Sequence, residues 1–140
     1  MSERKVIVAT HGDFAAGIRN SVRMVAGDLA DEIEVYGLYP GASAADYAAE
    51  LEKRISKESQ IQYVILTDIY GASVCTAMYP LTQYENVVLF TGLNLSLLIN
   101  LLISYPEALD EHAADCLVRE ARTGIRAISL QTGTVEENDF

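Results

Sequence analysis

The sequence has 140 residues, of which 50% are hydrophobic and 21% are charged, a composition typical of one globular α/β domain. Its formal net charge of −10 argues against a nucleic-acid partner, since nucleic-acid phosphates require a basic protein surface. The same charge would suit a partner with a basic docking surface, although solubility alone explains it equally well. Cys75 and Cys116 lack the spacing of a zinc site, so we interpret them as buried thiols and expect no metal or other cofactor.

The N-terminal residues lead directly into an apolar pattern, without the hydrophobic segment of a signal peptide. The most apolar window, residues 93–103, is interrupted by Asn94, Ser96 and Asn100 and is too short to cross a bilayer. These features predict a cytoplasmic protein. Residues 1–130 are expected to form a single domain, followed by a disordered acidic tail over residues 131–140.

Five short apolar runs, rich in β-branched residues, predict strands. Helical patterns lie between them, so the expected order of elements is β-α-β-α-β-α-β-α-α-β. Such an order favours an α/β fold with a doubly wound, mainly parallel sheet, helices on both faces and the last strand at an edge. The predicted strands cover residues 6–11, 33–38, 63–68, 87–91 and 125–130.

Capping patterns predict where the first two helices begin. Asp13 is expected to cap a helix that ends at Gly27. Ser43 and Asp46 have the spacing of a capping box, which predicts a second helix from that point. The residues expected to face the core are Phe14, Ile18, Val22 and Val25 in the first helix and Tyr47, Leu51 and Ile55 in the second.

The later helices are predicted from breakers and apolar content. A helix begins near Ser73, and Pro80 should kink or shorten it because proline lacks a backbone N–H. Residues 93–103 form a pattern that is apolar nearly all round, which predicts a helix covered by protein. The last helix is expected over residues 106–122, with proline at its first position and Gly124 at its end.

Two predicted strands end in residues that carry chemistry, namely His11 after the first strand and Asp68 after the third. The carboxyl ends of parallel strands share one edge of the sheet, where α/β proteins handle ligands, so we expect the two side chains to meet. A histidine there can carry a proton, bind a metal or accept a phosphoryl group. In phosphoryl transfer, a carboxylate such as Asp68 would fix the tautomer of the ring and stabilise its developing positive charge.

The residues after Asp68 predict a turn that could bind phosphate. Gly71, Ala72 and Ser73 are small enough for the backbone to approach a phosphate, and the Ser73 hydroxyl adds a donor. Thr10 and Thr67 could add further hydroxyls near the ring. Transfer between two histidines requires no metal, because it depends mainly on positioning.

Purely structural explanations compete with each of these assignments. A lone strand-end histidine is more often a turn residue, Asp68 could cap a turn, and Gly-x-Ser is a common sequence. Asp13 is a rival partner for His11, although helix capping is its simpler role. The coincidence of a strand-final histidine with a strand-final Asp-x-x-Gly-x-Ser favours a site. His112, beside Glu111 in an exposed helical pattern, is assigned no role.

Five motifs in order resemble the enzyme IIA component of the mannose family of the bacterial phosphoenolpyruvate-dependent sugar phosphotransferase system. The resemblance extends over about residues 6–129, nearly the whole chain. The motifs are Ile7-Val8-Ala9-Thr10-His11-Gly12, Pro40-Gly41, Thr67-Asp68-Ile69-Tyr70-Gly71-Ala72-Ser73, Gly92-Leu93-Asn94 and Glu120-Ala121-Arg122-Thr123-Gly124-Ile125.

The resemblance implies that His11 receives a phosphoryl group from the histidine-containing phosphocarrier protein. It implies that His11 then passes the group to a separate enzyme IIB, through which the protein serves a membrane sugar permease. In the family, Nε2 is the acceptor, the residue matching Asp68 holds the other ring nitrogen, and the residue matching Ser73 helps to hold the phosphate. The family also implies a homodimer in which about residues 126–130 add antiparallel to the partner's sheet and cover an edge.

The chain departs from the family pattern at two places. The usual Gly-Gly-Ser-Pro is Gly71-Ala72-Ser73-Val74 here, and the frequent Asn-x-Pro is Asn94-Leu95-Ser96. Ala72 would restrict the backbone if its position required a positive φ. Two other functions stay open: the phosphocarrier subunit of the phosphotransferase-dependent dihydroxyacetone kinase, whose first domain is similar, and a non-catalytic regulatory module that docks partners.

Overall fold

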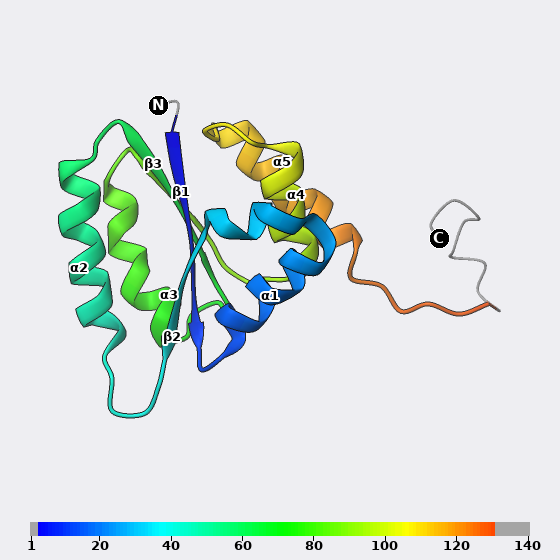
Figure 1. Ribbon diagram of the computed structural model, residues 1–140, viewed down its shortest axis with the longest axis horizontal. Helices are drawn as coiled ribbons and strands as arrows, with labels where there is room; N and C mark the ends of the chain where they lie inside the picture. The colour runs from blue at the N-terminus through cyan, green and yellow to red at the C-terminus, as the bar shows by residue number, and fades with distance from the viewer. Residues whose placement is uncertain (1–2, 131–140) are drawn as a thin grey trace.

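A parallel sheet with the strand order β2-β1-β3-β4 forms the centre of the molecule (Figure 1). The computed structural model describes residues 3–130, and its strands are β1 (Glu3–His11), β2 (Ile33–Leu38), β3 (Ile61–Thr67) and β4 (Val87–Phe90). The register pairs Val6 of β1 with both Ile33 of β2 and Val64 of β3, so β1 and β3 are the inner strands. This arrangement confirms the predicted α/β class and the parallel sheet.

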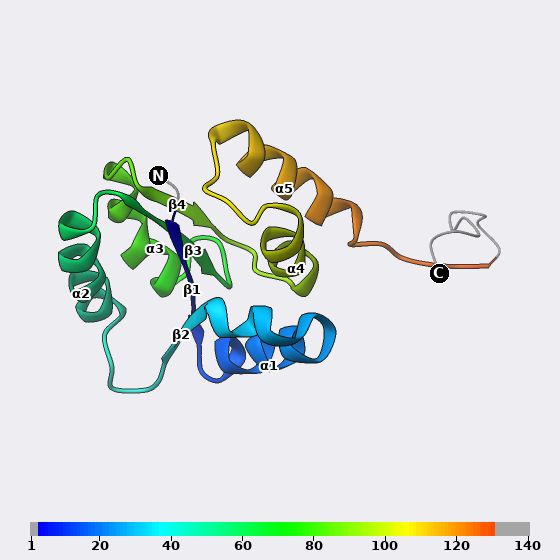
Figure 2. The same ribbon diagram turned by 45° about the horizontal axis from the view of Figure 1, so that its top comes forward.

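Helices cover both faces of the sheet, as expected for a doubly wound fold (Figure 2). One face carries α2 (Ala44–Lys57) and α3 (Ser73–Met78), and the other carries α1 (Phe14–Ala26), α4 (Leu95–Ser104) and α5 (Glu111–Thr123). Two short 3₁₀ segments, η1 (Gly27–Glu32) and η2 (Tyr79–Gln83), complete the regular structure of the described residues. Pro80 is at the start of η2, so the helix that begins at Ser73 is short, as predicted.

The inner strands divide the core into two hydrophobic clusters. Along β1, Val6 and Val8 point towards α1 and α4, whereas Ile7 and Ala9 point towards α2 and α3. The alternation follows from the two-residue repeat of a strand, and burial on both faces explains why the middle of β1, from Val6 to Ala9, is continuously apolar. The apolar helix α4 is covered by α5 and α1, which agrees with its predicted burial.

The two ends of α1 differ from the sequence prediction. Asp13 is at the N-cap position but makes no capping hydrogen bond, and the first turn is capped by Thr10, whose Oγ1 accepts from the Ala15 N–H at 2.8 Å. Phe14 and Val25 are exposed, and the buried residues of the helix are Ala15, Ile18 and Val22. The apolar stripe is therefore narrower than predicted. Gly27 ends the helix with φ of +59°, as expected.

The last predicted helix is too long at its N-terminus. It begins at Glu111, not at Pro106, and Asp110 is its N-cap, accepting from the Ala113 N–H at 2.8 Å. The segment before it is held in a non-helical form by contacts with distant strands. Gln62 of β3 both donates to and accepts from the Leu109 backbone at 2.7 Å.

The fifth predicted strand is absent from the single chain. Residues 125–130 have no regular secondary structure, and Ile125, Ile128 and Leu130 are exposed. In Figure 1 this segment, drawn in orange, extends away from the helices and the sheet. The acidic tail predicted over residues 131–140 lies outside the described residues.

Three smaller predictions also have outcomes in the structure. Ser43 precedes α2 but makes no side-chain capping bond, so the predicted capping box is wrong. Cys75 is buried and Cys116 is only half-buried, and both thiols are free. Among residues 3–130, no helix has the length and apolar character needed to cross a membrane.

Candidate functional site

His11 and Asp68 meet at the carboxyl ends of the two inner strands. His11 is the last residue of β1, and Asp68 follows Thr67, the last residue of β3. The chain passes from β2 on one side of β1 to β3 on the other side, so the order of the sheet reverses between β1 and β3. Ligands bind at such a switch point in open α/β sheets, because the loops that leave the two strands diverge there. The parallel register therefore brings together two residues that are 57 positions apart.

One oxygen of Asp68 holds both the backbone and the side chain of His11. The Oδ2 atom accepts from the His11 backbone N–H at 2.8 Å and is 2.9 Å from Nδ1 of the ring. The other oxygen, Oδ1, accepts from the Ile69 N–H at 3.0 Å. With a carboxylate at Nδ1, the neutral ring carries its proton on that nitrogen, and Nε2 carries a lone pair.

The environment of Asp68 favours its charged form. Its side chain is 6% exposed, and that burial acts to raise its pKa. The N–H groups of the His11 backbone and ring donate to the carboxylate and lower its pKa, and the net result is a pKa below the ordinary value. Asp68 is therefore ionised at neutral pH, ready to stabilise positive charge on the ring.

The opposite edge of the His11 ring faces solvent and Ser73. The side chain of His11 is 41% exposed, whereas Asp68 is nearly covered. The Ser73 Oγ atom is 3.3 Å from Nε2, and Ser73 is the first residue of α3. The ring thus lies between a buried carboxylate on one nitrogen and an exposed hydroxyl on the other.

The turn between Asp68 and α3 has the conformation that brings Ser73 back to the ring. Gly71 has φ of +78°, a value that favours glycine, and the Ala72 N–H donates to the Ile69 carbonyl at 3.2 Å. Ala72 itself has φ of −78°, so an alanine is accommodated there without strain. The replacement of the family's second glycine therefore leaves the turn intact.

The hydroxyls of Thr10 and Thr67 bond to groups within the fold. Both residues are fully buried. The Thr10 hydroxyl caps α1 and donates to the His11 carbonyl at 3.4 Å, and the Thr67 hydroxyl donates to the Phe90 carbonyl at 3.3 Å. Their predicted role as phosphate donors is therefore wrong, because each hydroxyl is engaged within the fold beneath the site.

An open groove of about 600 Å³ adjoins the His11 site. Gly71, Ser73 and Thr76 line one wall, at the start of α3, and Leu38 and Ala42 to Ala45 line the other, between β2 and α2. Because Ser73 belongs both to the groove and to the contact with Nε2, a molecule in the groove would have access to that nitrogen. In the described part of the chain, no group of three or more His, Cys, Asp or Glu side chains is arranged to hold a metal ion.

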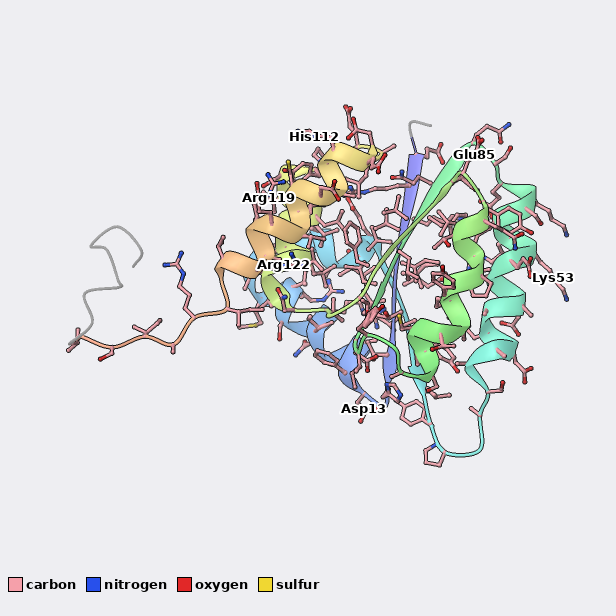
Figure 3. The ribbon with its side chains drawn as sticks, turned by 180° about the vertical axis from the view of Figure 1, so that it is seen from behind. Asp13, Lys53, Glu85, His112, Arg119 and Arg122 are labelled. Carbon is pink, nitrogen blue, oxygen red and sulfur yellow. The ribbon has the colours of Figure 1, made fainter. Side chains whose placement is uncertain are left out.

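Sequence reasoning missed Tyr39, which lies beside this site. Its hydroxyl donates to Oδ1 of Asp13, the residue two positions after His11. The sequence contained no signal for this pair, since Asp13 fits the pattern of a helix cap and Tyr39 belongs to a loop. His112 lies on α5 with its Nε2 3.6 Å from the Cys116 Sγ, and Figure 3 shows it far from Asp13.

Comparisons with known proteins agree with the motifs and the fold. Residues 5–118 match the model of the family described as "PTS system fructose IIA component", where PTS denotes the phosphotransferase system. The sorbose-specific EIIA component of the Klebsiella pneumoniae PTS is 31% identical over 97 residues, which are 69% of this chain and 70% of that protein.

Solved structures give the same result. A putative phosphoenolpyruvate-dependent sugar PTS permease from Klebsiella pneumoniae has a TM-score of 0.84 at 28% identity, over 94% of this chain and 96% of its own. The mannose/sorbose-specific IIA subunit from Enterococcus faecalis has a TM-score of 0.77 at 26% identity, over 91% and 96% of the two chains. With a family match over most of its length, the chain belongs to the mannose/sorbose family of IIA components of the phosphoenolpyruvate-dependent sugar phosphotransferase system.

Proposed function

We propose that this IIA component is a phosphocarrier that accepts a phosphoryl group on Nε2 of His11. The donor is the histidine-containing phosphocarrier protein, and the acceptor of the next step is enzyme IIB of a sugar permease. The observation that carries the proposal is the environment of one ring: Nδ1 is 2.9 Å from a buried carboxylate, and Nε2 faces solvent and the Ser73 hydroxyl.

The transfer of the phosphoryl group between the two histidines requires no cofactor. The Nε2 lone pair attacks the phosphorus of the donor's phosphohistidine, a new N–P bond forms, and the donor's N–P bond breaks. The bonding electrons return to the donor's ring, and the proton on Nδ1 of His11 stays in its hydrogen bond to Asp68. In the next step a nucleophile of enzyme IIB attacks the phosphorus, the N–P bond of His11 breaks, and its bonding electrons return to Nε2. Positioning and electrostatic stabilisation supply the catalysis.

Each residue of the site has a distinct part in this step. His11 is the acceptor, and Asp68 fixes the tautomer and stabilises the positive charge that develops on the ring. The Ser73 hydroxyl donates to a phosphoryl oxygen. The backbone at Gly71 and Ala72 shapes the turn, and the first N–H groups of α3 lack partners within the helix and can donate to the same oxygens.

We further propose that the protein works in the cytoplasm as a homodimer. Among the described residues β4 pairs on one side only, with β3, which leaves its other edge open. Residues 125–130 are extended and expose Ile125, Ile128 and Leu130, an unfavourable state for apolar side chains. Antiparallel addition of residues 126–130 to the partner's sheet would cover both features.

Mass spectrometry after incubation with phosphoenolpyruvate and the general phosphotransferase components tests the proposed acceptor. The protein should gain one phosphoryl group, and His11→Ala should gain none, because its nucleophile is missing. His112→Ala is the matched control and should be labelled like the wild type. Equal labelling of His11→Ala would refute the assignment, and an unlabelled wild type would favour a non-catalytic docking module.

A further inference from the structure

The segment that follows His11 is joined to the end of β2 by two hydrogen bonds. The Gly12 N–H donates to the Leu38 carbonyl at 2.8 Å, and the Tyr39 hydroxyl donates to Asp13 Oδ1. Figure 3 shows Asp13 at the turn between β1 and α1, at the end of the molecule where the loop between β2 and α2 also lies. His11 is thus held by Asp68 from the side of β3, while the turn after it is held from the side of β2.

Gly37 allows this close approach between the two segments. A Cβ atom at Gly37 would lie 2.3 Å from the Gly12 carbonyl oxygen and 3.0 Å from Cε2 of Tyr39, so a side chain there would clash with the backbone. The Gly12 carbonyl and the Tyr39 ring therefore approach the same point on β2. Gly12 itself has φ of +55°, and the turn it forms depends on these contacts with β2.

Asp13 is available for this contact because it does not cap α1. Its backbone has φ of −87° and ψ of 4°, and its side chain makes no capping bond. Thr10 caps the helix in its place, so the Asp13 carboxylate is free to accept from Tyr39. That hydrogen bond raises the pKa of the Tyr39 hydroxyl above its ordinary value.

We propose that Tyr39 is a positioning residue for phosphoryl transfer, acting through Asp13. The pair, here called the Tyr39–Asp13 bridge, holds the turn after His11 against β2 and keeps the ring aligned on Asp68.

The inference rests on the proposed phosphoryl acceptance by His11, and single-turnover transfer from the phosphorylated carrier protein tests it. Tyr39→Phe keeps the ring and removes the hydroxyl. It should lower the transfer rate at saturating carrier by about fivefold while the half-saturating concentration stays near the wild-type value, because misalignment affects the reacting geometry. An unchanged saturating rate would overturn the proposal.

A double-mutant cycle identifies whether Tyr39 acts through Asp13. Asp13→Ala should slow transfer to a similar extent, and Tyr39→Phe should add nothing in the Asp13→Ala background. Independent, multiplying effects of the two substitutions would contradict a bridge. Tyr84→Phe is the matched control, because the Tyr84 hydroxyl also donates to a carboxylate, Glu52 Oε1 at 2.9 Å. Figure 3 places its neighbour Glu85 at the opposite end of the molecule from Asp13.

A measurement without phosphoryl transfer separates failure of this inference from failure of the proposed function. In amide NMR spectra, the His11 and Gly12 resonances should shift in Tyr39→Phe and stay in place in Tyr84→Phe. If the wild type accepts no phosphoryl group but these shifts occur, the proposed function fails and the bridge stands. If His11 is phosphorylated but neither rate nor shifts change in Tyr39→Phe, the bridge is wrong and the function stands.

Discussion

The two ends of the sheet use polar side chains in opposite ways. At the amino end of the strands, buried polar groups have partners within the fold. The two N–H groups of the Asn86 amide are shared among three carbonyl oxygens at 3.0 to 3.2 Å. Gln62 bonds both backbone groups of Leu109, and Arg4 donates to the Leu101 carbonyl. At the carboxyl end, Asp68 is saturated but Nε2 of His11 is exposed beside one hydroxyl. One end anchors the elements to each other, and the other leaves a nucleophile available.

This difference indicates that the chemistry of the site can be altered without loss of the fold, and that the stability of the fold can be altered without loss of the chemistry. Polar groups at the amino end are costly to lose, because each leaves a buried partner without a hydrogen bond. The ring of His11 is partly solvated, so its chemistry can be altered at small cost in stability. Substitutions at the two ends should therefore affect different quantities.

The largest effect is expected at the carboxyl end, on rate. Asp68→Asn should reduce phosphoryl transfer to His11 by about 10³- to 10⁴-fold, because a neutral amide does not stabilise the positive charge that develops on the ring. The protein should still fold, since the Asn Oδ1 can accept from the His11 backbone N–H. Single-turnover labelling and circular dichroism measure the two quantities. Asp46→Asn, which removes an exposed carboxylate from α2, is the charge-matched control and should transfer normally.

Phosphoryl transfer by Asp68→Asn at the wild-type rate would contradict the role of Asp68 at the carboxyl end of the sheet. It would mean that the ring needs no ionised partner and that exposure of Nε2 alone makes the site.

A smaller effect is expected at the amino end, on stability. Gln62 is 1% exposed, and Gln62→Ala would leave the N–H and the carbonyl of Leu109 without their partner. We expect the free energy of unfolding to fall by about 2 to 6 kcal/mol, since each of the two buried groups left unpaired costs about 1–3 kcal/mol. Denaturant unfolding measures the loss. Gln60→Ala, at an exposed neighbouring position, should change stability little.

Transfer by folded Gln62→Ala should match the wild type at temperatures below its unfolding transition. A slow transfer step in a fully folded Gln62→Ala protein would show that the two ends are coupled and would contradict their separation.

The same contrast explains which features were predictable from sequence. The contact between His11 and Asp68 was predictable because strand periodicity gives the position of each strand end, and parallel pairing then places the ends side by side. The start of α5 was missed because Gln62 of β3 holds Leu109 in a non-helical segment, a contact between residues 47 positions apart. The sequence pattern around Pro106 does not indicate the contact between Gln62 and Leu109.

Local ambiguity accounts for the other errors near the site. Asp13 and Thr10 can both cap α1, and the backbone angles of the turn decide for Thr10. Once Thr10 is used as the cap, its hydroxyl is lost to the site and Asp13 becomes free for Tyr39. The predicted cap by Asp13 was therefore wrong for the same reason that the Thr10 hydroxyl is engaged within the fold.

The smallest expected effect is the pH dependence of the contribution of Asp68 to stability. The hydrogen bonds from His11 lower the pKa of Asp68 in the folded protein, so folding favours its ionised form. That contribution is fully present above the pKa of the unfolded chain, near 4, and is lost as the pH falls through the lower folded pKa. The stability difference between the wild type and Asp68→Asn should therefore shrink as the pH falls from about 5 to below 4. Urea unfolding of both proteins across this range measures it, with Asp46→Asn as the exposed control. A difference that grew as the pH fell below about 4 would mean that burial, which raises the pKa of Asp68, outweighs the two N–H donors of His11. The carboxylate would then be an acid held in place by the fold and not a base that orients the ring.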